Sequence, residues 1–452
     1  MARPSIVALF LIVLFSVLTF DTQMRWIGNP FQNDVDQYYS YLVAQFIHHD
    51  FSFHFQHGYW LIESPIGDMI PKVTMGMAMF YFPFFALGHG LAGYLGYEQL
   101  GYSTPYAICV HIGTLCYVFV GFWYMRKTLL MFFSEWVAAV TMLLIMFATN
   151  LFYYTFKEGE MAHSYLFFLF SLFFYHALKW HVTRHFKYLC YLSLIGGFVS
   201  LIRPTEVLIF LIPLLYQVNS KASFIAKLRE LAVLKWKLIV PALLFILPLI
   251  PQMLFWKSFA NQYLFFSYGS NEGFFFSDPK LWSVLFGWHK GWFVYTPLVF
   301  FMITGLVMMW FRWRDMAWPI TAYLVLNIYL ISSWWDWGFG GAFGMRALVQ
   351  TYAFLSVPLA YFIQWCFSVA SVKARISLIA STIAVYLFLI TLNLVQVFQS
   401  QHAILHWDSM TKKAYWYVFL KTKFSDNERA YLKTLLSKPD YNAMRKGERD
   451  EN

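Results

Sequence analysis

The sequence predicts an all-α polytopic membrane protein, and three observations lead to this class. Hydrophobic residues make up 60% of the 452 residues and charged residues only 12%, about half of the roughly 25% found in soluble domains. Charge-free apolar runs recur along the chain, and several exceed the roughly 18 residues that mark a membrane span. The aromatic content of 22% suits lipid-facing and interfacial positions. This composition argues against a soluble enzyme and a nucleic-acid-binding protein.

The first apolar run, residues 5–20, follows Arg3 and is followed by Asp21 without a small-residue cleavage site. We therefore expect an uncleaved first span with Arg3 on the inner side. Further apolar runs follow in order at 73–97, 105–125, 136–156, 161–178, 188–202, 207–218, 238–256, 291–311, 316–335, 347–372 and 376–407. Two of these runs are short and are divided by Arg203 and Pro204, so we expect the proline to end the first of them.

The distribution of Lys and Arg predicts which loops lie on each side of the membrane. If the run 73–97 stays in the outer leaflet, the inner loops carry most of the Lys and Arg residues, as the positive-inside rule requires. We therefore expect about 11 transmembrane helices plus an outer-leaflet juxtamembrane segment. The predicted transmembrane domain covers residues 1–407, with external loops at 21–104 and 257–290, and a polar tail covers residues 408–452.

The cysteines give no sign of a cross-linked or zinc-bound fold. All four lie in apolar runs without paired spacing: Cys109, Cys116, Cys190 and Cys366. Neither a disulfide framework nor a structural zinc site is therefore expected.

Two carboxylates, Asp34 and Asp36, stand close together in the first external loop. Side chains at i and i+2 share a face in extended backbone but diverge by roughly 200° on a helix. Either both carboxylates coordinate one divalent cation, Mg²⁺ or Mn²⁺, or one carboxylate acts as a general base while the other supports it. The sequence shows no nucleotide-binding fingerprint.

A carboxylate pair directly after the first span resembles the signature of the GT-C superfamily, polytopic glycosyltransferases that use polyprenyl-phosphate sugars. The wider pattern resembles a bacterial group of GT-C proteins over roughly residues 30–350. The matching stretches are Asp34 with Tyr38-Tyr39-Ser40-Tyr41-Leu42, Lys72 with Gly76 and Phe82-Pro83-Phe84, Gly197 with Leu201-Ile202-Arg203-Pro204-Thr205, Gly291-Trp292-Phe293 with Thr296-Pro297, and Trp337-Gly338 with Phe343-Gly344-Met345-Arg346. The chain departs from the pattern at Asp36 and Gln37, and at His289 and Lys290, which stand where a Ser-x-Arg-like stretch is expected.

The resemblance implies a GT-C-like fold and transfer of a hexosyl or pentosyl group from a polyprenyl-phosphate donor to a glycan, lipid or protein acceptor. The expected catalytic residue is Asp34, as base or as metal ligand together with Asp36. The expected substrate-binding residues are Lys72, Arg203, His289, Lys290, Trp337 and Arg346. The reaction would take place at the outer face of a bacterial inner (plasma) membrane, beneath the loop 257–290, and no nucleic acid is expected as a partner.

The residue types support these roles. Lys72 and Arg203 are flanked by apolar sequence, so they either neutralise a lipid-phosphate leaving group or snorkel to the interface. Arg346 follows a glycine-rich turn through which the backbone can approach a ligand, and its guanidinium can bind phosphate through two parallel hydrogen bonds. Trp337 fits either an interfacial aromatic belt or a surface on which a sugar stacks.

Further polar residues of the external loops are secondary candidates. Glu158, Glu160 and His163 form a tight polar cluster that suits either a second metal or acceptor contact or an internally satisfied loop. Asp50 is another carboxylate of the first external loop.

Two functions other than glycosyl transfer stay open. One is a lipid-linked-sugar flippase or transporter, and the other is a non-catalytic membrane scaffold. A transporter predicts charged residues along the depth of the spans, whereas here the acidic residues collect at one face.

Overall fold

The computed structural model describes residues 3–53, 55, 61–269 and 272–449. This part of the chain is mostly helical; its strands are one antiparallel hairpin, β1 (Leu61–Glu63) with β2 (Met69–Pro71). Within it, five helices are long and apolar enough to cross a membrane: Thr104–Leu129, Lys235–Ala260, Arg314–Ser333, Arg346–Ser368 and Val372–Gln401. The predicted all-α class is confirmed, and these helices are compatible with an integral membrane protein.

The first half of the chain supplies the short helices of the predicted first external loop and several long helices. α1 begins at Pro4, a residue that suits a first helical position because its missing N–H needs no partner there. The elements are α1 (Pro4–Leu18), α2 (Phe20–Ile27), α3 (Asn33–Val43), the π-helical η1 (Ala44–His48), β1, β2, α4 (Gly76–Leu95), α5 (Thr104–Leu129), α6 (Glu135–Phe147), α7 (Leu151–Phe156), α8 (Ala162–Thr183), α9 (Phe186–Ile202), the 3₁₀ helix η2 (Pro204–Phe210) and α10 (Leu211–Leu215).

The predicted break between two short helices is confirmed at the end of α9. Arg203 adopts an extended conformation, with φ −144° and ψ 104°. The following proline disfavours the helical conformation at this position. The side chain of Arg203 therefore stands at a helix end.

The second half continues with α11 (Lys221–Val233), η3 (Lys235–Leu238), α12 (Ile239–Ile246), η4 (Leu247–Leu249), α13 (Ile250–Ala260), α14 (Leu281–Phe286), α15 (Trp292–Tyr295), α16 (Val299–Arg312), α17 (Arg314–Ser333), η5 (Arg346–Thr351), α18 (Tyr352–Ser368), α19 (Val372–Gln401), α20 (Lys412–Val418), α21 (Asp426–Leu435) and α22 (Tyr441–Arg445). Only 22% of the most apolar window of α19 is buried. A long apolar surface of this kind needs a lipid or protein partner.

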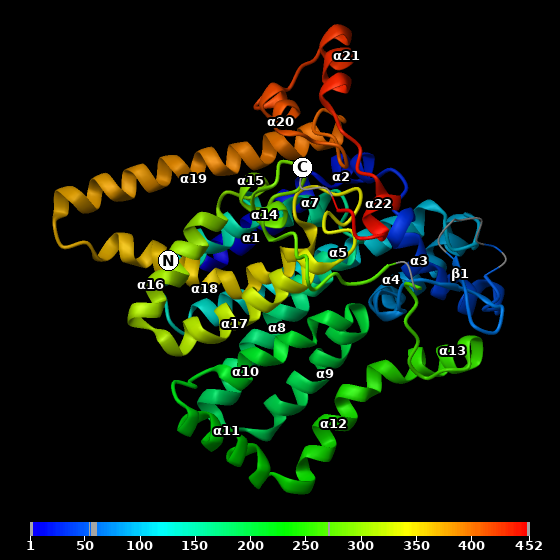
Figure 1. The fold of residues 1–452 in the computed structure, drawn as a ribbon, viewed down its shortest axis with the longest axis horizontal. Helices are drawn as coiled ribbons and strands as arrows, with labels where there is room; N and C mark the ends of the chain where they lie inside the picture. The colour runs from blue at the N-terminus through cyan, green and yellow to red at the C-terminus, as the bar shows by residue number, and fades with distance from the viewer. Residues whose placement is uncertain (1–2, 54, 56–60, 270–271, 450–452) are drawn as a thin grey trace.

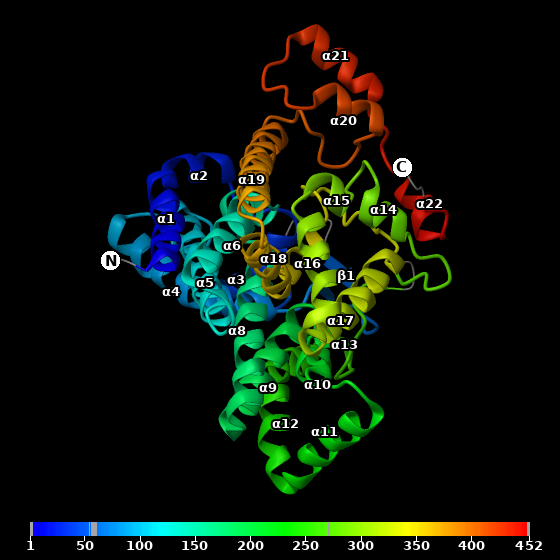
Figure 2. The same ribbon diagram turned by 90° about the vertical axis from the view of Figure 1, so that its left-hand side faces the viewer.

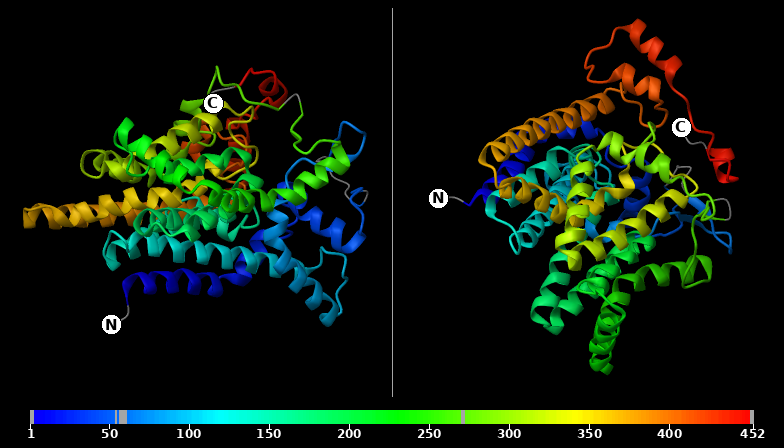
Figure 3. Two further views of the ribbon diagram at one scale, coloured as in Figure 1. Left: turned by 90° about the horizontal axis from the view of Figure 1, so that it is seen from below. Right: turned by 60° about the vertical axis from the view of Figure 1, so that its left-hand side comes forward.

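The two ends of the helical bundle carry different elements. In Figure 1 the N-terminus and the turns that join α16 to α17 and α18 to α19 lie at the left-hand end, whereas α3, β1, α4 and α13 lie at the right-hand end. The left panel of Figure 3 shows the same separation from below. Three segments that the charge distribution predicts to be inside therefore lie at one end, and α3, β1 and α4 from the loop predicted to be external lie at the other.

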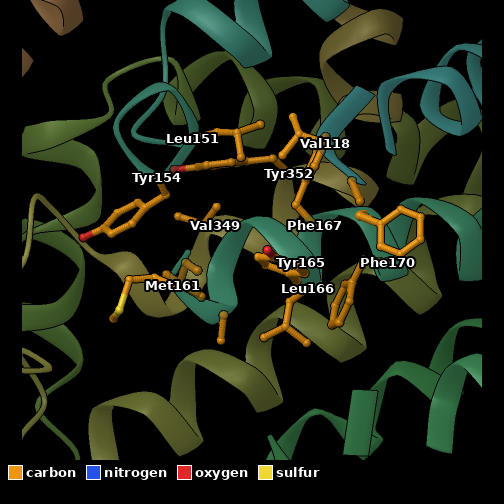
Figure 4. Close-up of a cluster of buried hydrophobic side chains, with 14 of the residues drawn as sticks. Val118, Leu151, Tyr154, Met161, Tyr165, Leu166, Phe167, Phe170, Val349 and Tyr352 are labelled. Carbon is orange, nitrogen blue, oxygen red and sulfur yellow. The ribbon is translucent and has the colours of Figure 1, made fainter. Parts of the chain in front are cut away.

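A buried core holds the helices around the start of η5 together. Figure 4 shows side chains from α5, α7, α8, η5 and α18 in contact, among them Tyr154, Phe167 and Tyr352. All three side chains are fully buried. Full burial of one large apolar side chain stabilises the folded state by roughly 1.5–3 kcal/mol. Because α8 packs against both α5 and η5, this core fixes the position at which η5 begins.

The C-terminal tail packs back onto the bundle. In Figure 2 α20 and α21 lie at the top of the molecule, whereas α22 returns to the side of α14. Tyr415 of α20 contacts the rings of Trp288 and Tyr295, with ring centres 5.3 and 5.6 Å apart. Met444 of α22 is buried. The tail, which the sequence predicts as a polar segment, therefore packs against the segment around α14 and α15.

Candidate functional site

Asp34 and Arg346 form an ion pair that joins α3 to the turn before η5. Asp34 lies in the first turn of α3, where a carboxylate interacts favourably with the helix dipole. Its Oδ2 atom lies 3.3 Å from Nη2 of Arg346, and the two side chains are 32% and 14% exposed. The structure thus brings together the residues predicted as catalytic base and phosphate ligand.

The glycine-rich turn before η5 positions Arg346. Gly344 has φ +61° and its α-carbon faces Tyr295; an added Cβ would lie 3.0 Å from the Cβ of Tyr295, so a larger residue would meet both backbone strain and a clash. Tyr154 of α7 holds the turn in place, because its hydroxyl accepts a hydrogen bond from the Phe343 N–H at 3.0 Å. The Nε atom of Arg346 is buried and has no hydrogen-bond partner among the described residues.

Arg203 lies beside this pair. Its guanidinium carbon is 5.4 Å from the ring centre of Phe339 in the glycine-rich turn. No carboxylate lies within ion-pair distance of Arg203 in the part of the chain that the structure describes. The next turn is anchored by Glu206, which accepts hydrogen bonds from Tyr323 at 2.7 Å and Gln350 at 2.6 Å. Arg203 therefore projects from a fixed backbone.

Two tyrosines, Tyr38 and Tyr268, lie among these charges. Tyr38 follows Asp34 by one helical turn and is buried, and burial together with the charge of Asp34 raises the pKa of its hydroxyl. Tyr268 comes from the loop after α13, and its hydroxyl feels the charges of Asp34, Arg203 and Arg346. The i, i+4 spacing of Asp34 and Tyr38 was a usable signal, because such residues share a helix face.

Lys72 reaches the same tyrosine from the end of β2. Its ammonium lies 4.8 Å from the ring centre of Tyr268 and forms an ion pair with Glu272. Its carbonyl accepts a hydrogen bond from the Ser267 hydroxyl. The close approach of α4 to α9 supports this segment, because a Cβ at Gly76 would lie 2.9 Å from the Ile202 side chain. Lys72, Arg203 and Arg346 therefore surround one region.

His289 and Lys290 lie next to Gly338 in the glycine-rich turn. Both contact other groups of the protein. Lys290 is 1% exposed, and its amino group donates hydrogen bonds to the carbonyls of Ala342 and Trp407. Burial lowers the pKa of Lys290 to about 7, although the nearby charge of Asp408 opposes the shift. His289 Nε2 lies 3.6 Å from Asp408 Oδ1. The two residues predicted as substrate ligands thus join the turn to the tail.

Trp337 is also covered by protein. It is 2% exposed and lines a cavity of about 20 Å³ together with His289, Met410 and Met444. This volume suits about one water molecule. In this arrangement the Trp337 ring packs inside the protein and offers no face to a sugar.

The secondary candidates lie in three different places. Asp50 caps the loop after η1, accepting a hydrogen bond from the Ser52 N–H at 2.8 Å. Glu160 is 2% exposed, and its Oε1 atom lies 2.9 Å from Nδ1 of His111. Glu158 accepts a hydrogen bond from Tyr153 at 3.0 Å; burial raises its pKa, and the charge of Arg346 opposes this.

His163 is buried at the start of α8. Its ring centre is 5.0 Å from that of Tyr154, the tyrosine that fixes the glycine-rich turn. The predicted cluster is therefore divided: Glu158 and His163 border the Arg346 region, whereas Glu160 belongs to a contact with α5.

The carboxylate pair does not fit a single metal ion held by both residues. Asp34 and Asp36 lie on a helix, so their side chains diverge. Asp34 pairs with Arg346, while Asp36 Oδ1 accepts a hydrogen bond from the Tyr102 hydroxyl at 3.2 Å. No group of three or more His, Cys, Asp or Glu side chains with metal-site geometry occurs among the described residues.

An apolar groove of about 580 Å³ opens beside this region. Its walls come from α3 and η1, α4 and α13, and include Tyr41, Phe46, Met79, Phe82, Leu254 and Phe259. The Tyr41 hydroxyl donates a hydrogen bond to the carbonyl of Val73 at 2.9 Å, one residue after Lys72. A long apolar chain in the groove would therefore end near the cations.

No protein-family model matches the chain, and no curated protein is significantly similar to it.

Proposed function

We propose that the protein is a membrane glycosyltransferase of GT-C type that moves a sugar from a polyprenyl-phosphate donor to an acceptor on the external face. The observation that carries the proposal is the Asp34–Arg346 ion pair at 3.3 Å, with Arg203 and Lys72 around it. This arrangement supplies one carboxylate for a proton and several fixed cations for a phosphate.

Asp34 is the proposed general base. It takes the proton from the acceptor hydroxyl while that oxygen forms a bond to the anomeric carbon of the sugar. The bond between the anomeric carbon and the phosphate oxygen breaks, and its electron pair leaves with the polyprenyl phosphate. Arg346 orients the Asp34 carboxylate through the ion pair.

The leaving phosphate is held by Arg203, Arg346 and Lys72. Fixed cations stabilise the negative charge that develops on a leaving group without reorganising during the reaction. The unpartnered, buried Nε of Arg346 and the absence of a carboxylate partner for Arg203 among the described residues leave donors available to an anion. Tyr268, which lies between these cations and Lys72, is a further hydrogen-bond donor.

The apolar groove is the proposed binding site of the polyprenyl chain. Its apolar lining from α3, α4 and α13 suits isoprene units, since burial of apolar surface contributes roughly 25 cal/mol per Å². This assignment places α4 in the outer leaflet, within a topology of about 11 spans that follows the positive-inside rule. The proposed location is a bacterial inner (plasma) membrane, with the site outward.

One assay tests the proposal directly. Purified protein is incubated with a panel of polyprenyl-phosphate sugars and simple glycan, lipid and peptide acceptors, and release of lipid phosphate is measured. We expect release from at least one donor, and loss of release in the Asp34→Asn variant. Release that is unaffected by this substitution, or no release from any donor, contradicts the proposed reaction.

A further inference from the structure

A second carboxylate, Glu272, is shared between two cations at the edge of the candidate site. It lies in the loop between α13 and α14 and is 8% exposed. Its Oε2 atom pairs with the ammonium of Lys72, and its Oε1 atom lies 3.3 Å from Nη2 of Arg445. Three segments far apart in the sequence, the end of β2, this loop and α22, therefore meet at one side chain.

Each of the two cations is also held by an aromatic ring. Lys72 lies 4.8 Å from the ring centre of Tyr268, and Arg445 lies 4.7 Å from that of Trp335. A cation above an aromatic face gains about 0.5–2 kcal/mol, depending on its exposure. Both cations therefore keep a contact that does not depend on Glu272.

The docking of the tail has its own anchor, separate from Glu272. Arg449 is 4% exposed and donates hydrogen bonds at 3.0 Å to the carbonyls of Ser332 and Trp334. Its Nη2 atom lies 3.4 Å from Asp278 Oδ2. The position of Arg445 is thus fixed by a neighbouring contact on the same tail.

We propose that Glu272 and an anionic headgroup compete for Lys72, and that Arg445 of the tail keeps Glu272 paired when the headgroup binds. This inference rests on the proposed function, since it takes the anion at Lys72 to be the phosphate of a prenyl-phosphate lipid. Glu272 and Arg445 are then positioning residues of the donor site, and the C-terminal tail is a functional part of that site.

In the proposed exchange, the headgroup takes the place of Glu272 at Lys72. The charges explain why this exchange needs two cations. A phosphate that reaches Lys72 repels the carboxylate already there. A carboxylate that loses its only partner in a buried place carries a large desolvation cost. Because Oε1 already faces Arg445, Glu272 can give up Lys72 and remain paired. Arg445 therefore lowers the cost of donor binding without touching the donor.

The test uses the purified full chain in detergent and farnesyl phosphate as a short prenyl-phosphate probe, with affinity measured by titration calorimetry. Glu272→Gln removes the competitor, so we expect binding about fivefold tighter than wild type, the scale of one partly exposed ion pair. Arg445→Gln removes the alternative partner, so we expect binding about fivefold weaker. The matched control is Asp278→Asn, which weakens the Arg449 anchor but leaves Glu272 intact, and we expect wild-type affinity.

The opposite signs of the two effects make the proposal falsifiable. If Glu272→Gln binds the probe as weakly as Lys72→Met, Glu272 only supports the fold and the exchange is wrong, while the donor proposal stands. If Arg445→Gln and Asp278→Asn weaken binding equally, docking of the tail is the cause and the exchange is again wrong. If wild type does not bind farnesyl phosphate, both the exchange and the donor proposal fall.

Discussion

The Oδ2 atom of Asp34 lies 3.3 Å from Nη2 of Arg346, which joins the first turn of α3 to the glycine-rich turn before η5. Asp34 is carried by α3, and Arg346 by a turn fixed to α7 through Tyr154. Each side chain therefore depends on the other for its orientation. This dependence makes the pair the most informative place for substitutions.

Asp34→Asn should abolish most of the activity while the protein still inserts and melts like wild type. The substitution keeps the size of the side chain but removes its charge and nearly all of its basicity. General-base catalysis contributes about 10²–10⁴-fold, so we expect a loss of that order in lipid-phosphate release. Turnover within about threefold of wild type, well below that range, would exclude Asp34 as base, and Asp36, Asp50 and Glu160 would be tested next.

Asp36→Asn should have a smaller effect, because Asp36 bonds to Tyr102 and points away from Asp34. We also expect EDTA to leave the activity unchanged, since the two carboxylates do not share a partner. Loss of activity in both Asp variants, together with inhibition by EDTA that Mg²⁺ or Mn²⁺ reverses, would instead establish a metal held by the pair.

Arg346→Lys should weaken donor binding although the positive charge is kept. Arginine can pair with Asp34 and a phosphate at once through its planar group, whereas lysine is a point charge. We expect a loss of about tenfold or more in donor affinity, because charged hydrogen bonds contribute about 1.5–3 kcal/mol. Donor affinity equal to wild type in a titration of this variant would reduce Arg346 to a structural role.

Lys290→Met should remove part of the pH dependence of stability. The folded-state pKa of Lys290 is about 7, below its ordinary value of 10.5. Between these values the unfolded chain binds more protons than the folded chain, so Lys290 makes stability rise with pH from about 7 upward. One proton contributes at most about 1.4 kcal/mol per pH unit.

The measurement is the Tm of wild type and Lys290→Met in detergent at pH 7, 8 and 9. We expect the rise in Tm across this window to be smaller in the variant. Asp336, whose pKa burial raises to about 6, is ionised in the folded and the unfolded chain at these pH values and adds little to the slope. Parallel curves for the two proteins would contradict the burial of an ionisable amine at this position.

The proposed topology is tested by labelling single cysteines in a background without Cys109, Cys116, Cys190 and Cys366. A cysteine at Tyr263, which is 55% exposed in the predicted external loop, should react with an impermeant reagent added outside. A cysteine at Arg229 in α11 should react only after the membrane is opened. The reverse pattern would invert the whole assignment and place Asp34 inside.

Several features of the site could be predicted from the sequence because their signals are local. The apolar runs predicted most of the helices, and Pro204 predicted the end of α9. The glycine-rich turn before Arg346 and the carboxylate after the first span are also visible in short stretches. How many of the apolar helices cross the membrane, and on which side each loop lies, remain predictions.

Other features depend on segments that meet only in the folded chain. Nothing near Lys290 indicates that its amino group bonds to the carbonyls of Ala342 and Trp407, so a phosphate contact was the natural hypothesis. Glu272 and Arg445 were not predicted, because the role of each depends on contacts with the other and with Lys72.

The sequence by itself determined the helical class, the placement of apolar segments and the candidate carboxylate and arginines, since hydrophobicity and backbone preferences act over a few neighbouring residues. Only the tertiary structure decided which charges pair. It turned Asp34 toward Arg346 and Asp36 toward Tyr102, and it brought the tail to Glu272. The physical reason is that an ion pair depends on a few ångströms of separation between side chains, and that separation is set by the packing of whole helices.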